Sequence, residues 1–444
     1  MNSNPDYEII GNEKYNVEVT VWMTTYNHGK YIENAIREIF LQKVSFGIEI
    51  VIFDDASTDD TSEIITRLQS QYNNILYLRA RQNTYIKGNR NQLIYEIENK
   101  YLTGKYTAVC EGDDIWIDRT KLQRQYDFME RHKECALTIH NAIWIDCTNS
   151  SEFTMFPSDP YEDITSHILG EEEVICMAKR NPPTASFFHR RYLLDEPFFY
   201  FNAMVGDYTL QLNALNKGTI YYDNRIMSAY RFHVSGGYTE RLAKDKSFAM
   251  NHALDLSVFL KRYNDYTKGY YEEFVLESMD AFLTSGIMLA ENLEEIVIAL
   301  DEMVNNSKID LREKEFILCR TKIIWNHIYD NDLKDYINQH AKTYIFGAGD
   351  YSRKLCTKAN DKVKNVTGIV VTSMTDNLKE ICNKKVITID QIDEQDVGFI
   401  IAVSPRVLPQ IVRILESKGF NNWVCPFLGS TKMDLSLNTE PKLE

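Results

Sequence analysis

The sequence predicts an α/β fold with a mostly parallel β-sheet. Apolar, β-branched runs alternate with amphipathic segments through the first 150 residues, and a second alternation begins near residue 342. Short connections between such segments favour parallel strands, with helices on both faces of the sheet. A chain of 444 residues has room for about two to four domains.

The first alternation predicts four strands and four helices. Strands are expected where β-branched residues run together, and helices where apolar residues recur at spacings of three and four. The carboxyl ends of parallel strands meet at one edge of a sheet, and ligands of such sheets bind there. The expected strands are 17–23, 48–54, 75–80 and 106–110, and the expected helices are 31–41, 61–72, 90–101 and 119–131.

Changes of pattern along the chain predict three parts. Residues 151–239 mix aromatic residues with turns, and the next hundred residues carry long amphipathic stretches without proline. We therefore expect a first α/β domain over 1–240, a helical linker or bundle over 241–335, and a small α/β domain over 336–444. The strands of the small domain are expected at 366–373, 385–389 and 397–404, after the strand–turn–helix segment 342–355 and before a helix at 407–418.

Net charge, cysteine spacing and the length of apolar runs exclude several classes of protein. Lys and Arg number 49 against 64 Asp and Glu, a net charge of −15, which argues against nucleic-acid binding and against a polybasic membrane anchor. The eight cysteines are widely spaced and none forms a CxxC pair, as expected of reduced, mostly buried thiols. The N-terminus lacks a signal-peptide pattern, and no stretch approaches the roughly 20 apolar residues of a membrane span. A cytoplasmic protein is predicted.

Polar segments follow three of the expected strands. MTTYN (23–27), DDASTDDT (54–61) and CEGDDIW (110–116) lie at strand ends, and GDYTLQL (206–212) comes later in the chain. The topology would bring the first three to one edge of the sheet. Three separate signals would then form one site.

Adjacent carboxylates suggest a cation site. Asp113 and Asp114 repel each other, and a hard divalent cation resolves that repulsion while bridging to phosphate oxygens. A Gly-Asp turn is the alternative. In DDAS, Asp54 and Asp55 end the strand and could accept a ring N–H from a nucleobase, while Ser57, Thr58 or Asp59 could cap the following helix.

The order of TYN, DDxS, a Gly- and Asp-rich DD and a GD segment resembles that of the inverting glycosyltransferases of family 2, which have the GT-A fold. The resemblance covers about residues 15–240. It implies a nucleotide-diphosphate sugar donor, with UDP-sugar favoured, and a divalent metal, Mn²⁺ or Mg²⁺. It also implies transfer of a hexose-type sugar to a glycan or lipid-linked acceptor, in making a bacterial capsule, O-antigen or cell-wall glycan.

The resemblance also implies roles for individual residues. Thr24 and Tyr26 match the nucleoside contacts and Asp55 matches the carboxylate that recognises the base, with Asp54 beside it. Asp113 would face the ribose or donor sugar.

The same resemblance implies which residues bind the metal and act as the base. Asp114 would bind the metal, and Asp207 matches the catalytic base, although a carboxylate there could also cap a helix. His233 would add to the metal shell or be structural. Lys87 and Arg90 would contact phosphate or belong to a solvated helix start.

The segment YIFGAGDYSRKL (344–355) opens the last domain with two of the three glycines of a dinucleotide fingerprint. The third position is Ser352, and the next strand lacks the acidic ribose ligand, which argues against a dehydrogenase. The segment resembles small Rossmann-like domains of nucleotide-sugar and polysaccharide enzymes. It would bind a nucleotide or sugar, or serve packing and homo-oligomerisation.

Two rival functions remain open from the sequence. A sugar-1-phosphate nucleotidyltransferase would need a Gly-rich, basic loop after the first strand, and TTYNHGKY is poor in these features. A non-catalytic nucleotide- or glycan-binding partner would bind without turnover. The absence of an expected membrane span leaves peripheral docking to a lipid-linked acceptor open.

Overall fold

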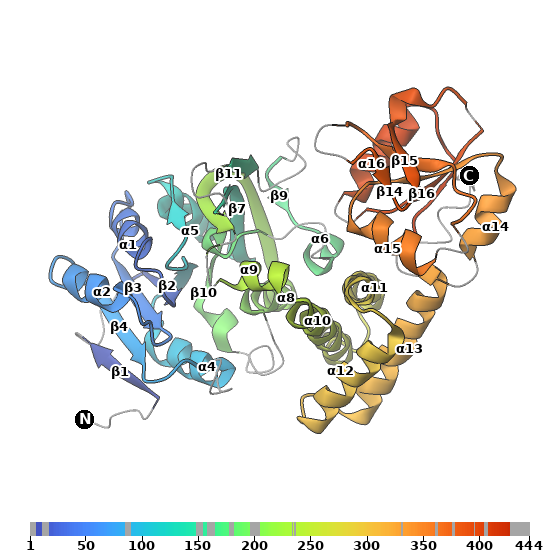
Figure 1. Ribbon diagram of the computed structural model, residues 1–444. Helices are drawn as coiled ribbons and strands as arrows, with labels where there is room; N and C mark the ends of the chain where they lie inside the picture. Colours follow the sequence, from blue (N-terminus) through green and yellow to red (C-terminus); the bar gives the residue numbers. More distant parts are fainter. Residues whose placement is uncertain are drawn as a thin grey trace. The chain divides into compact units, whose positions relative to one another are not determined.

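The computed structural model describes most of the chain, in two compact units (Figure 1). Unit 1 comprises Met1–Val174 and Arg180–Lys244, and unit 2 comprises Ile175–Lys179 and Asp245–Glu444. The predicted division into three parts stays a prediction. The described residues are 6–10, 17–84, 90–147, 154–157, 165–176, 182–195, 205–232, 234, 237–329, 332–359, 363–374, 378–394, 396–403 and 407–426.

The described strands of unit 1 form one 11-stranded sheet. Its main path runs β1-β4-β3-β2-β5-β10-β7-β11-β6, while β8 pairs with β7 and β9 pairs with β11. The strands are β1 (Tyr7–Ile10), β2 (Val19–Thr25), β3 (Ile48–Asp54), β4 (Ile75–Ala80), β5 (Tyr106–Val109), β6 (Ile115–Trp116), β7 (Cys135–Asp146), β8 (Thr154–Pro157), β9 (His167–Ile168), β10 (Phe188–Arg190) and β11 (Thr219–Phe232).

The predicted parallel sheet is confirmed in the first half of unit 1. Strands β4, β3, β2 and β5 pair in parallel, and every residue of β3 is buried. Strands that are buried along their whole length are expected where helices cover both faces of a sheet. Beyond β5, the short β10 pairs antiparallel with both β5 and β7, and β7 and β11 pair in parallel.

The four predicted helices of the first 150 residues are confirmed, with ends shifted by three residues or fewer. Apolar residues recur along one face of each, as amphipathic helices require. The helices of unit 1 include α1 (Ile32–Phe40), α2 (Thr61–Gln69), α4 (Arg90–Tyr101), α5 (Lys121–Arg131), α6 (Glu171–Ile175), α8 (Gly206–Lys217) and α9 (Tyr238–Lys244), with 3₁₀ turns η1 (Thr184–Ser186) and η2 (Arg191–Asp195).

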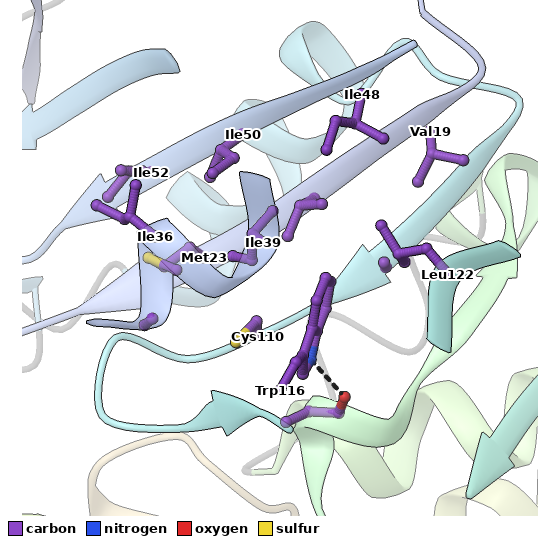
Figure 2. Close-up of a cluster of buried hydrophobic side chains, with 14 of the residues drawn as sticks. Val19, Met23, Ile36, Ile39, Ile48, Ile50, Ile52, Cys110, Trp116 and Leu122 are labelled. Atoms are coloured by element: carbon purple, nitrogen blue, oxygen red, sulfur yellow. Dashed lines mark hydrogen bonds between the residues drawn. The ribbon is translucent and has the colours of Figure 1, made fainter. Parts of the chain in front are cut away.

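A core of branched aliphatic side chains holds α1 against the sheet (Figure 2). Ile36 and Ile39 of α1 lie with Ile50 and Ile52 of β3, and all four are fully buried. Trp116 closes one end of this cluster, and its indole N–H donates to the carbonyl of Ala185 at 2.9 Å. The polar atom of the largest side chain in the cluster is therefore satisfied.

Unit 2 combines long helices with a second sheet. Its sheet runs β14-β15-β13-β12-β16-β17, and all neighbours except β14 and β15 are parallel. The first parallel strand is central and the chain then moves to either side, which confirms the Rossmann-like arrangement. The elements are α10 (Lys246–Tyr266), α11 (Glu272–Leu289), α12 (Leu293–Asn305), α13 (Leu311–Tyr329), α14 (Asp332–Gln339), β12 (Thr343–Phe346), α15 (Asp350–Lys358), β13 (Gly368–Val371), β14 (Glu380–Ile381), β15 (Lys384–Thr388), η3 (Ile389–Gln391), β16 (Gly398–Ile401), α16 (Leu408–Ser417) and β17 (Trp423–Val424).

Two further expectations concern the cysteines and membrane-spanning helices. All eight cysteines are free, and five of them are buried. Among the described helices, none combines the length and apolarity needed to cross a membrane.

A lysine is fully buried in the core of unit 1. The ammonium of Lys121 donates to Oε1 of Gln125 at 2.8 Å and lies 4.1 Å from the ring centroid of Trp116. Burial lowers the pKa of Lys121 to about 7, because the charged form loses its hydration. The amide of Gln125 in turn donates to the carbonyl of Ser186 at 2.9 Å.

This burial predicts a pH-dependent stability. In the folded state Lys121 loses its proton near pH 7, whereas in the unfolded chain it loses the proton only near the ordinary lysine pKa. Between these two pKa values the unfolded state binds more protons, so the free energy of unfolding rises with pH. Replacement by methionine (Lys121→Met) should remove a slope of about 1.4 kcal/mol per pH unit between about pH 8 and 9.5. Denaturant unfolding at several pH values measures it. The exposed Lys133→Met is the control, and equal slopes for both variants would contradict the assignment.

Candidate active site

Asp54, the last residue of β3, points into the protein. Asp54 is fully buried, and it accepts from the backbone N–H of Ser57 and the hydroxyl of Tyr77, both at 2.8 Å. The guanidinium of Arg79 lies 3.7 Å away. Both oxygens of Asp54 are therefore used inside the fold, where they hold the start of the following loop. Its predicted donor contact stays a prediction.

The second carboxylate fixes a neighbouring loop. Asp55 accepts from the backbone N–H of Thr84 at 2.7 Å, from the Thr84 hydroxyl at 3.0 Å and from Arg90 at 3.3 Å. Its own N–H donates to the carbonyl of Thr25 at 2.9 Å. Asp55 thus joins the ends of β2 and β3 to the segment before α4.

The loop after β2 is fastened to the loop after β3. Asn27 adopts a left-handed φ of 56°, its N–H donates to the Ser57 hydroxyl at 2.9 Å, and its side-chain oxygen accepts from the N–H of Thr58 at 2.8 Å. Asparagine tolerates this backbone conformation better than most residues. Thr24 is half-buried at the end of β2, and Tyr26 is 40% exposed.

The acidic loop packs directly on the β2 loop. The N–H of Gly112 donates to the carbonyl of Thr24 at 3.0 Å. A Cβ on Gly112 would lie 2.6 Å from Oγ1 of Thr25 and 2.9 Å from Nδ1 of His28, so only glycine fits. Nε2 of His28 lies 3.6 Å from Oδ2 of Asp113.

Asp114 is a buried carboxylate whose charge is only partly compensated. It is 0% exposed, and neither oxygen has a hydrogen-bond partner among the residues that the structure describes. Burial, and then the charges of Asp113 and Glu111, raise its pKa well above the ordinary value, although the nearby backbone N–H and charge of Arg231 act in the opposite direction.

Two more carboxylates belong to this group. Burial raises the pKa of Glu111, and the charges of Asp113 and Asp207 raise it further, while Arg90 lowers it. Asp207 lies in the first turn of α8, where its Oδ1 accepts from the N–H of Tyr208 at 2.6 Å. Burial raises the pKa of Asp207 to about 6. The alternative that Asp207 is the helix N-cap is wrong, because Val205 holds that position.

Strand β11 supplies a phenol and a guanidinium. Burial raises the pKa of Tyr230, and the carboxylates of Asp114, Glu111, Asp113 and Asp207 raise it further. The guanidinium of the next residue, Arg231, donates to the carbonyl of Asp113 and lies 4.8 Å from the ring centroid of Tyr31. The predicted Asp113, Asp114 and Asp207 are thus brought together, and Thr24 adjoins them through Gly112.

Of the residues predicted to bind a metal or phosphate, Asp114 and Arg90 are described by the structure. Lys87 and His233, predicted for phosphate and metal, lie outside the described residues. Within the described part of the chain, no three His, Cys, Asp or Glu side chains gather to hold a metal. Magnesium sites that act on phosphates often use only one or two protein carboxylates, and the unpartnered oxygens of Asp114 beside Asp113 fit that type.

Three site residues carry no assigned role in the sequence interpretation. His28 follows TYN, Glu111 opens EGDD, and Tyr230 precedes the Arg231–His233 segment. The signal for Glu111 was its place in an acidic triplet at a strand end. The signals for His28 and Tyr230 are weak, because their positions depend on how the loop and β11 fold back.

Comparison with known proteins identifies this region. Residues 20–189 match the family model for glycosyl transferase family 2. These residues are similar to the family 2 glycosyltransferases. An uncharacterized protein of Mycobacterium tuberculosis is 30% identical over 226 residues, which are 49% of this chain and 60% of that protein. The chain therefore spans less than two thirds of the length of this relative.

One further relative has a named activity, and one similar solved structure has a named ligand. WfaP of Escherichia coli, named a UDP-Glc:alpha-D-GlcNAc-diphosphoundecaprenol beta-1,3-glucosyltransferase, is 26% identical over 49% of this chain and 73% of its own length. A crystal structure of S. aureus TarS 1-349 in complex with UDP-GlcNAc aligns with 65% of this chain and 80% of that chain, at 16% identity and a TM-score of 0.48.

The buried charge of Asp114 predicts that a neutral replacement stabilises the metal-free protein. The folded state binds the Asp114 proton more tightly than the unfolded state, so stability falls as pH rises above the ordinary carboxyl pKa. Asp114→Asn should raise the free energy of unfolding by about 1–3 kcal/mol near neutral pH in EDTA. Thermal and denaturant unfolding measure it. The exposed Asp127→Asn should change little, and a destabilised Asp114→Asn would refute the interpretation.

Proposed function

We propose that the protein transfers a sugar from a nucleotide-diphosphate donor to a hydroxyl of a glycan or lipid-linked acceptor. One observation carries this proposal. Residues 20–189 match the family 2 model, and the loop after β5 carries Asp113 and Asp114 close enough to Asp207 that the charges of Asp113 and Asp207 both act on Glu111, while Asp55 fixes a neighbouring loop. A transferase of this kind needs a nucleoside site, a diphosphate site and a base in that order.

The nucleoside would bind at the ends of β2 and β3. Thr24, Tyr26 and Asp55 are the proposed contacts, with Tyr26 exposed enough to stack on a ring. Arg90, which contacts Asp55 and lowers the pKa of Glu111, lies between this part and the acidic loop, where a phosphate would be. Lys87 is proposed for the same role. UDP is the favoured nucleotide because the relative WfaP is named for a UDP-glucose donor.

Asp114 and Asp113 are the proposed holders of Mg²⁺ or Mn²⁺, with His233 as a further candidate ligand. When bound, the metal neutralises the charge that develops on the leaving diphosphate. A divalent cation also supplies the missing partner of the buried Asp114 carboxylate. The acidic loop keeps its place through Gly112, whose N–H holds the end of β2.

Asp207 is the proposed general base. Its carboxylate takes the proton of the acceptor hydroxyl as that oxygen forms a bond to the anomeric carbon of the donor. The bond from the anomeric carbon to the diphosphate oxygen breaks in the same displacement, and the nucleoside diphosphate leaves with the electron pair. A single displacement inverts the anomeric configuration. The first turn of α8 fixes the carboxylate through the N–H of Tyr208.

The biological setting is proposed from the same resemblance. Assembly of a bacterial surface polysaccharide in the cytoplasm would use such a donor and would require docking to a membrane-bound acceptor where the acceptor is lipid-linked. The Rossmann-like part of unit 2 is proposed to serve packing or oligomerisation. Its GAG turn has Gly347 at a φ of 115°, and a Cβ there would lie 2.7 Å from the carbonyl oxygen of Ala402.

The proposed function is tested by donor hydrolysis. A panel of nucleotide sugars is incubated with Mn²⁺, with Mg²⁺ and with EDTA, and release of nucleoside diphosphate is measured. Metal-dependent release from one donor supports a transferase and identifies the sugar. Nucleotide binding without turnover, even with a broad set of acceptors, would favour a binding protein. No binding of any nucleotide would overturn the proposal.

Replacement of the base should separate binding from turnover. Asp207→Asn is expected to lower kcat by about 10²–10⁴-fold, because the amide cannot accept the proton, while UDP affinity stays within a few-fold of wild type. Initial rates and calorimetric titration measure the two quantities. Asp195→Asn, an exposed carboxylate on η2, is the matched control. Substantial activity in Asp207→Asn would remove this residue from the mechanism.

The raised pKa of Asp207 predicts the acid limb of the pH profile. The base must be ionised, so kcat/KM should fall as pH drops through about 6, reaching about tenfold below its plateau near pH 5. Initial rates across the pH range test this on an identified donor. An acid limb near the ordinary carboxyl value of about 4 would contradict the assignment.

A further inference from the structure

An aromatic cluster lies next to the acidic group and has no role in the steps above. Trp144 of β7 lies edge-to-face with Tyr230 of β11 at 5.5 Å between ring centroids, and Phe232 lies at the same distance from Trp144. Tyr230 pairs directly with Trp144 in the parallel ladder, so these rings share one face of the sheet. All three side chains are half-buried, which leaves part of each accessible.

Strand pairing connects this aromatic cluster to the acidic loop. Ser228 and Ala229 pair antiparallel with Trp116 and Ile115, and Tyr230 and Asp114 are the next residues beyond this pairing on the two segments. The charges of Asp207, Glu111, Asp113 and Asp114 all act on the Tyr230 hydroxyl. Tyr230 therefore places the aromatic cluster next to the four carboxylates.

Strand order places the cluster away from the nucleoside contacts and beside the acidic loop. The sheet runs β3-β2-β5-β10-β7-β11-β6. Asp55 follows β3, Trp144 and Tyr230 lie on β7 and β11, and the acidic loop leaves β5 after Val109 and enters β6 at Ile115. A donor bound along this edge has its nucleoside at β3 and β2 and its diphosphate at the acidic loop. The space toward β7 and β11 is left for the molecule that receives the sugar.

A polar atom in the cluster also lacks a partner. Nε1 of Trp144 is buried and has no hydrogen-bond partner within the described part of the chain. Such a donor is costly unless something accepts from it. Aromatic faces beside a few polar groups are the usual lining of sites for small organic ligands. A pyranose offers both an apolar C–H face and hydroxyl acceptors.

We propose that Trp144, Tyr230 and Phe232 form the subsite for the acceptor sugar, a pyranose ring that stacks on the aromatic cluster with its reactive hydroxyl toward Asp207. This inference rests on the proposed function. Trp144 and Phe232 bind the ring without contacting the reacting atoms. Tyr230 follows Ala229, which pairs with Ile115 of β6, and so lies where the ring would meet the acidic loop.

The test uses protein labelled with 5-fluorotryptophan and observed by ¹⁹F NMR, with the Trp144 resonance assigned from Trp144→Phe. UDP, UDP-glucose and a panel of methyl pyranosides, including the glucoside and N-acetylglucosaminide, are titrated separately. The pyranosides are expected to shift the Trp144 resonance saturably. Phe232→Leu should weaken this binding by about fivefold or more, Phe232→Tyr should retain it, and the exposed Tyr192→Leu is the matched control.

The outcomes separate this inference from the proposed function. Saturable UDP binding in wild type and in every variant shows that the donor side is folded. With UDP bound, no shift of Trp144 by any pyranoside would overturn the acceptor subsite and leave the transferase proposal standing. A shift caused by UDP-glucose but by no free pyranoside would assign the cluster to the donor sugar and overturn the inference. Failure of all nucleotides to bind would refute the proposed function itself.

Discussion

Four carboxylates gather at one edge of the unit 1 sheet, and Asp114, the most deeply buried, has no hydrogen-bond partner within the described residues. The nearby cationic side chains are already engaged, since Arg90 contacts Asp55 and Arg231 donates to the carbonyl of Asp113. A fold that keeps this much negative charge together gives up stability for it. A cation that bridges to an anionic ligand would compensate this charge.

The loops around this charge are held by short, internally satisfied contacts. Asp54 accepts hydrogen bonds from its own loop and from Tyr77, so it holds the loop after β3 in place. Asp55 holds the neighbouring loop through Thr84. Gly112 allows the acidic loop to approach the β2 loop closely enough for a backbone hydrogen bond. Rigid supports of this kind hold functional groups in place before a ligand arrives.

Sequence patterns predicted the parallel half of the sheet because its strands are uniformly apolar and its helices have clear periodicity. They also predicted that three polar segments would meet, since parallel strands end at a common edge. They gave no account of β7, whose apolar residues are interrupted by His140 and Asn141, or of the antiparallel β10, whose three residues carry too little pattern. Asp54 and Asp55 look alike in the sequence, and both are buried; only the fold shows that Tyr77 holds Asp54 while Thr84 and Arg90 hold Asp55. The partners of His28 and Tyr230 depend on long-range contacts for the same reason.

The insertion of β10 also affects how the protein is made. Phe188–Arg190 completes the sheet between β5 and β7, although β5 ends at Val109 and β7 begins at Cys135. During synthesis, at about 5–20 residues per second, the edge of β5 that will pair with β10 stays unpaired until about eighty further residues have been made. An unpaired apolar edge is a template for wrong association. The parallel strands β4, β3, β2 and β5 can therefore assemble early on the ribosome, whereas the part of the sheet beyond β5 depends on a late strand, and the nascent chain is most exposed to aggregation in between.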